Sequence, residues 1–118
     1  MDGKEIVQQL AQACDDRKGQ NIIALDMRNV SLVADYFLIC HGTNERQVQA
    51  IAMALKETMA ENGIDIKRME GLEQARWVLI DIDDVVCHIF HQDERDYYNL
   101  ERLWGDAPRL TLSAVQKG

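Results

Sequence analysis

The stretch WVLIDIDDVVCHIF, from Trp77 to Phe90, decides the fold, because it has the pattern of two strands joined by a tight turn. Asp83 and Asp84 supply the expected two-residue loop, and this loop sets the register of the hairpin. Because side chains alternate between the faces of a strand, one face is wholly apolar and is expected to enter the core: Val78, Ile80, Ile82, Val85, Cys87 and Ile89. The other face is a mixture that suits contact with a partner: Trp77, Leu79, Asp81, Val86, His88 and Phe90.

Hydrophobic periodicity on the N-terminal side of this hairpin predicts alternating helices and strands. The expected elements are a helix over 3–18, strands over 21–26 and 36–41, a helix over 45–61 and a strand over 64–69. A strand, a helix and a further strand form a crossover unit, so we expect 36–41 and 64–69 to be parallel neighbours. The pattern predicts an α/β fold: a single domain with a mixed sheet of about five strands, flanked by helices.

The segment that follows the hairpin has helical spacing, with one apolar stripe formed by Tyr97, Leu100, Leu103 and Trp104. On a continuous helix Tyr98 lies on the side opposite that stripe, and its neighbours there are Glu94, Arg95 and Arg102. From Gly105 onward the chain contains a proline and shows no periodicity. We therefore expect a domain over residues 1–108 and a flexible C-terminal tail over 109–118.

Composition narrows the class of partner. The chain has 118 residues, 47% of them hydrophobic, and a formal net charge of −7. An acidic protein lacks the basic footprint of a nucleic-acid binder, so we expect no sequence-specific nucleic-acid binding. A basic partner is favoured instead, and ribosomal proteins are in that class. The three cysteines are scattered and no apolar stretch approaches membrane-spanning length, so we expect a cytoplasmic protein that is not embedded in a membrane.

An enzyme is the first alternative. Asp81 and Asp83 share a face near a strand end and could hold a divalent metal, while Gly42-Thr43 could receive a phosphate, as in a nucleotidyltransferase. Against this, Asp83 sits where the hairpin must turn, and the chain has no glycine-rich loop with a lysine. Cys87 and His88 point to opposite faces, which disfavours a zinc site. We therefore expect no catalytic residues, no metal and no cofactor.

A homodimeric adaptor, in which the hairpin face pairs with a second copy, is another alternative. Trp77 is one of two tryptophans and lies on the mixed face of the hairpin. Protein interfaces are enriched in Trp, Tyr and Arg, so this face is the expected contact surface in either case.

Two segments carry a resemblance to a known family. DYFLICHGTNERQVQAIA (residues 35–52) and WVLIDIDDVVCHIFHQDERDYYNLERLWGDAP (residues 77–108) closely resemble the ribosomal silencing factors, also called Iojap-like proteins. The resemblance covers nearly all of residues 3–108. One departure is at Ile82-Asp83, where family members commonly carry an aromatic or aliphatic residue and then glycine before the aspartate, and it alters the turn of the hairpin.

The resemblance implies a non-enzymatic factor with a single α/β domain, distantly like the nucleotidyltransferases. Such factors bind the large ribosomal subunit through its fourteenth ribosomal protein, block joining of the small subunit and repress translation when nutrients are scarce. Carried onto matching positions, the family's interface points to Trp77, Leu79 and Tyr98. Physical reasoning adds their expected neighbours to this interface: His88, Phe90, Arg95 and Arg102. A homodimer of the free factor is left open.

Overall fold

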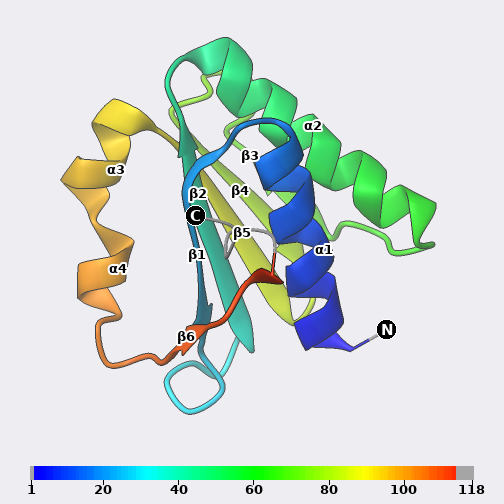
Figure 1. The fold of residues 1–118 in the computed structure, drawn as a ribbon, viewed down its shortest axis with the longest axis vertical. Coiled ribbons are helices and arrows are strands. Elements are labelled where there is room, and N and C mark those ends of the chain that lie inside the picture. The colour runs from blue at the N-terminus through cyan, green and yellow to red at the C-terminus, as the bar shows by residue number, and fades with distance from the viewer. Residues whose placement is uncertain (1, 114–118) are drawn as a thin grey trace.

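One mixed six-stranded sheet organises the molecule (Figure 1). A computed structural model describes residues 2–113, except for the side chains of residues 96–98, 100 and 101. In chain order the elements are α1 (Gly3–Asp16), β1 (Gln20–Asp26), β2 (Tyr36–Gly42), α2 (Glu45–Glu61), β3 (Arg68–Glu70), β4 (Trp77–Ile82), β5 (Val85–His91), α3 (Gln92–Tyr98), α4 (Leu100–Leu103) and β6 (Arg109–Leu110). The strand order is β3-β4-β5-β2-β1-β6, and β2 and β5 form the parallel pair. The expected α/β class is confirmed.

The β4–β5 hairpin has the register that the sequence predicts. Val78 faces Ile89, Ile80 faces Cys87 and Ile82 faces Val85. All six residues of this face are at most 2% exposed, so they form the centre of the core. The turn residue Asp83 has a φ of 59°, a left-handed conformation that glycine adopts at lower cost than other residues.

The predicted strand over 64–69 is wrong over 64–67, and only its last two residues, Arg68 and Met69, belong to a strand. Residues 64–67 have no regular structure, and β3 is a short edge strand that pairs antiparallel with β4. Ile64 and Ile66 nevertheless pack against the core, which explains why their alternation imitates a strand. The parallel neighbour of β2 is β5 instead, with Phe37 opposite Val86 and Ile39 opposite His88. The chain that leaves β2 therefore crosses past the positions of β5 and β4 to form β3 at the edge of the sheet. The β4–β5 hairpin then fills the two positions between β3 and β2.

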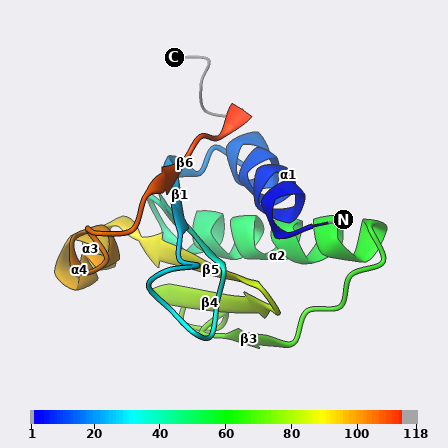
Figure 2. The same cartoon turned by 90° about the horizontal axis from the view of Figure 1, so that it is seen from below.

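Helices α1 and α2 both cover one side of the sheet, whereas α3 and α4 lie on the other side, near one end (Figure 2). Each long helix begins at a side-chain cap: Asp2 accepts a hydrogen bond from the Glu5 N–H, and Asn44 accepts one from the Gln47 N–H. The larger hydrophobic cluster lies between the sheet and these two helices. A second, smaller cluster includes Ala107, and Trp104 packs against it, so the chain that follows α4 covers this part of the sheet. No helix within residues 2–113 is long and apolar enough to cross a membrane.

The C-terminal segment is not a loose tail over 109–112. Arg109 and Leu110 form β6, which pairs antiparallel with β1. Leu112 is 3% exposed and belongs to the main core. The Gln8 side chain donates to the Thr111 carbonyl at 2.7 Å and accepts from the Ser113 N–H at 3.0 Å. The expectation of a flexible tail is therefore wrong for these residues, and residues 114–118 lie outside the described part of the chain.

The expected single helix after β5 is also interrupted. Asn99 has a φ of 45° and ends α3, so α3 and α4 are two short helices with different axes. The helical stripe from Tyr97 to Trp104 assumes one continuous helix and does not describe this segment.

All three thiols are buried. Cys14 lies on α1, Cys40 on β2 and Cys87 on β5, and the Cys14 and Cys40 sulfurs are 3.8 Å apart. The contact with Cys40, followed by burial, raises the pKa of Cys14, and burial raises the pKa of Cys87. These thiols are packing groups of the core.

Candidate functional site

Half-buried apolar side chains gather on the side of the sheet that α1 and α2 do not cover. Phe37 of β2, Trp77 and Leu79 of β4, and Val86 of β5 all belong to this side and are all partly exposed. We call these four residues the open face. They come from three adjacent strands, so the sheet itself fixes their spacing. Partly exposed apolar side chains that share one face of a rigid sheet are typical of a protein-binding site.

Trp77 is held from below. Its ring stacks on Phe90, the residue directly opposite on β5, with centroids 5.2 Å apart. The indole Nε1–H donates to Nδ1 of His88 at 3.1 Å. The loop before β4 approaches closely, because a side chain on Gly71 would come within 2.2 Å of the Trp77 carbonyl oxygen. The stacking on Phe90 and the hydrogen bond to His88 fix the indole ring, while the close approach of Gly71 concerns the Trp77 backbone.

Three of the expected contact residues are buried instead of exposed. His88 and Arg95 are each 5% exposed, and Phe90 is fully buried. Side chains with so little exposure do not reach a partner directly, so the prediction that these three residues contact the partner is wrong. His88 and Phe90 lie beneath Trp77, and His88 also meets the edge of Phe37 with centroids 4.8 Å apart. They support the open face.

Arg95 fastens α3 to the sheet. Its Nη1 lies 3.0 Å from Nδ1 of His41 on β2 and donates to the Gln20 carbonyl of β1 at 3.3 Å. This buried guanidinium links α3 to β1 and β2, because the two strands supply acceptors that its desolvated donors need. Arg95 therefore positions the helix that ends at Tyr98.

Tyr98 and Arg102 are the remaining expected contacts. Tyr98 is the last residue of α3, and its side chain is among those that the structure does not describe. Arg102 lies on α4 and is exposed. Leu103, its neighbour, is 68% exposed, which adds an apolar group to this end of the molecule.

Sequence reasoning missed Phe37 and Trp104. Phe37 lies between His88 and Trp104, and its ring meets that of Trp104 nearly edge-on, with centroids 6.1 Å apart. The alternation of Tyr36, Phe37 and Leu38 already places Phe37 on a different face from its neighbours. The pairing of β2 with β5 was needed to show that this face is the one that carries Trp77.

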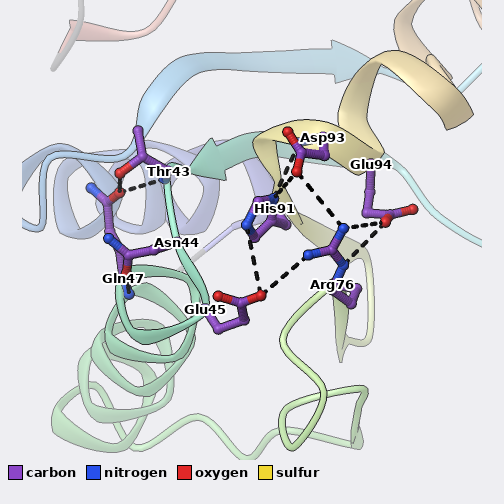
Figure 3. A network of polar contacts seen from close by, with 8 residues as sticks. All are labelled: Thr43, Asn44, Glu45, Gln47, Arg76, His91, Asp93 and Glu94. Carbon is purple, nitrogen blue, oxygen red and sulfur yellow. Dashed lines mark hydrogen bonds and ion pairs between the residues drawn. The ribbon is translucent and has the colours of Figure 1, made fainter.

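A polar network lies at the carboxyl ends of β2 and β5, where the expected phosphate site would fall (Figure 3). Thr43 donates through both its N–H and its hydroxyl to Oε1 of Gln47, at 2.7 and 3.1 Å. Arg76 donates to Glu94 at 2.7 Å and to Glu45 at 3.2 Å, which joins the starts of α2 and α3. The contact with Glu94 raises the pKa of Arg76. The pKa of Glu45 is lowered, first by a hydrogen bond from the Glu45 backbone N–H and then by the contact with Arg76. The hydrogen-bond donors of Thr43 and Arg76 are therefore already engaged by side chains of this protein.

The carboxylates considered for metal binding do not form a cluster with other ligands. Asp83 forms an ion pair with Lys67 at 2.7 Å, at the exposed turn. Among the side chains that the structure describes, which leaves out those of residues 96–98, 100 and 101, no group of three or more His, Cys, Asp and Glu is arranged to hold a metal ion.

A family model described as "Ribosomal silencing factor during starvation" matches residues 1–118. The chain belongs to the ribosomal silencing factor family. It is 61% identical over 112 residues to "Ribosomal silencing factor RsfS" of Bacillus subtilis, covering 95% of each protein. It is 59% identical over 115 residues to the silencing factor of Halalkalibacterium halodurans, covering 98% of each.

Solved structures agree with this membership. A Bacillus halodurans crystal structure superposes with a TM-score of 0.83 at 56% identity and covers 93% of this chain and 100% of that one. A Chromobacterium violaceum structure superposes with a TM-score of 0.87 at 35% identity and covers 98% of each. The silencing-factor fold is therefore the frame on which the open face lies.

Proposed function

We propose that this silencing factor binds the large ribosomal subunit through its fourteenth ribosomal protein and represses translation when nutrients are limiting. Relatives that match over nearly their whole length are named ribosomal silencing factors, which supports a role in regulating translation at the ribosome. The observation that carries the proposed contact is the open face, where Trp77 and Leu79 lie partly exposed on a rigid strand. The site of action is the cytoplasm, where the subunits join.

The mechanism that we propose is steric and needs no catalysis. The open face, together with Tyr98 and Arg102 at the end of α3 and on α4, docks on the ribosomal protein. The bound factor then occupies part of the surface that the small subunit needs, so the two subunits do not join. The net charge of −7 favours approach to a basic partner and acts mainly on the association rate.

Co-sedimentation with purified large subunits tests the docking surface. Trp77→Ala and Leu79→Ala each remove an apolar side chain of the open face, on β4. Each is expected to weaken binding by about 2 kcal/mol, which corresponds to roughly 30-fold in Kd. Met53→Ala is the matched control, because Met53 is an apolar side chain of α2 that is 39% exposed, on the other side of the sheet. It is expected to bind like the wild type.

A subunit-joining assay tests the steric step with the same variants. The wild type and Met53→Ala should prevent small and large subunits from joining, while the two open-face variants should lose this effect in proportion to their binding. Wild-type binding by folded Trp77→Ala and Leu79→Ala would show that the contact lies elsewhere. A factor that binds but leaves joining unchanged would refute the steric mechanism.

A further inference from the structure

A buried imidazole lies directly beneath the partly exposed indole of the open face. His88 sits on β5 opposite Leu79, and its ring is surrounded by three aromatic rings: those of Phe37, Trp77 and Phe90. It is 5% exposed, which is unusual for a histidine that faces no charged group in this cluster. Phenylalanine or leucine would pack in such a place without any polar atom to desolvate, so packing alone does not explain an imidazole here.

The hydrogen bond to Trp77 defines the protonation state of this imidazole. An indole nitrogen only donates, so Nδ1 of His88 must accept and must carry no proton. The proton of the neutral ring is therefore on Nε2. Burial lowers the pKa of His88 to about 4, which keeps the ring neutral near pH 7. His88 thus offers one acceptor, aimed at Trp77, over the whole physiological range.

The other ring nitrogen shows what this arrangement costs. Nε2 of His88 is buried and has no hydrogen-bond partner within the described residues. A buried donor without a partner destabilises the fold. His88 thus keeps an unpaired, destabilising Nε2–H while its Nδ1 accepts from the Trp77 indole. This combination points to a role in placing the indole.

We propose that His88 is a positioning residue, whose Nδ1 holds the Trp77 indole in the orientation that docks. This inference rests on the proposed function, since it assigns a cause to the order of a residue in that docking surface. It also defines the contact chemically. The only polar atom of the indole is engaged inside the protein, so whatever part of the ring reaches a partner is apolar, and the partner must meet it with apolar groups.

NMR of the ¹⁵N-labelled free protein tests the hydrogen bond without any ribosome. Long-range proton–nitrogen correlation is expected to show His88 as the Nε2–H tautomer at pH 7. The Trp77 indole N–H is expected to exchange slowly with solvent, and Trp104→Phe assigns the two indole signals. An Nδ1–H tautomer, or a rapidly exchanging Trp77 indole, would overturn the proposal.

Two variants then separate positioning from packing. His88→Phe keeps a flat ring but removes the acceptor, whereas His88→Asn places an amide oxygen near the position of Nδ1. We expect His88→Phe to speed exchange of the Trp77 indole and to weaken binding to large subunits about 10-fold, a typical loss of preorganisation. We expect His88→Asn to recover both properties at least in part. Equal losses in the two variants would mean that His88 only packs.

A double-mutant cycle completes the test. With Trp77→Phe already present, His88→Phe should cause no further loss of binding, because the indole that it positions is gone. Additive losses would overturn the proposal. If the wild type itself fails to bind large subunits, the proposed function is wrong, but the NMR experiment still decides whether His88 orders Trp77. The two failures are therefore distinguishable.

Discussion

At the scale of single residues, His88 couples the stability of the protein to pH. Its surroundings are aromatic, so protonation places a charge among groups that cannot solvate it. Burial lowers the pKa to about 4 in the folded protein, against an ordinary value of about 6.5. The unfolded chain therefore binds the proton first, and the stabilising effect of the neutral ring is lost as the pH falls from about 6.5 towards 4.

We expect the contribution of His88 to the free energy of unfolding to fall by about 2 kcal/mol between pH 7 and pH 5. Urea denaturation at the two pH values measures it. Carboxylates also titrate in this interval, so the comparison is with His88→Phe, which cannot take up this proton. The difference in stability between wild type and variant should change by that amount in favour of the variant at pH 5, and a constant difference would contradict the assignment.

The residues of the site show where sequence reasoning stops at this scale. Alternation along the hairpin correctly placed Trp77, Leu79, His88 and Phe90 on one face. It could not tell which of the four are covered, because His88 packs against Phe37 of β2, which is distant from the hairpin in sequence. Local alternation decides which side of the sheet a side chain points to, whereas its exposure depends on the tertiary structure.

At the scale of the element, the hairpin turn contains a local conflict. Asp83 has a φ of 59°, while Asp84 is not among the residues with positive φ. A residue with a Cβ is strained in the left-handed region, although aspartate tolerates it better than most. Asp84 has a different task, because its carbonyl accepts hydrogen bonds from the N–H groups of Asp35 and Tyr36.

Glycine substitutions at the two turn positions should therefore have opposite signs. Asp83→Gly is expected to raise the free energy of unfolding by about 0.5 kcal/mol, because relief of strain exceeds the loss of an exposed ion pair with Lys67. Asp84→Gly is expected to lower it by about 0.5–1 kcal/mol, because it only adds freedom to the unfolded chain. Thermal and urea unfolding measure both, and the same sign for both would refute this account of the turn.

The elements themselves were predictable where local chemistry decides them. The two-residue loop at Asp83-Asp84 is a local signal, and the hairpin turns where the sequence places it. Asp2 and Asn44 are residue types that favour the start of a helix, and each caps one in the structure. The strand predicted over 64–69 failed because Ile64 and Ile66 are apolar for a tertiary reason, as cover for the core edge. The break at Asn99 was missed because asparagine is also tolerated inside helices.

At the scale of the whole molecule, the two ends of the chain stabilise each other. Gln8 of α1 hydrogen-bonds the backbone on both sides of Leu112, and the Leu112 side chain enters the core between α1 and the sheet. A segment with no periodicity thus completes the core and adds the sixth strand. Nothing local in the sequence marks this, since two residues of strand and one buried leucine are too short to form a pattern.

Truncating that leucine should destabilise the whole fold. Leu112→Ala is expected to lower the free energy of unfolding by about 2 kcal/mol, the lower end of the range for a buried leucine. Leu32→Ala makes the same chemical change in the loop between β1 and β2, where the side chain is fully exposed. It should stay within about 0.5 kcal/mol of the wild type. Similar effects of the two substitutions on urea unfolding would contradict the docked C-terminal segment.

Because all three thiols are buried, the folded protein should not react with thiol-directed reagents. Maleimides react with thiolates. The pKa values of Cys14 and Cys87 are raised, so these thiols stay protonated, and burial keeps the reagent away from Cys40 while the core is intact. A cysteine introduced at Met53 is then the one site that a fluorescent maleimide labels in the native protein. The factor can carry a dye on the side away from the open face, and its arrival on single ribosomal subunits can be timed without altering a native residue of the core.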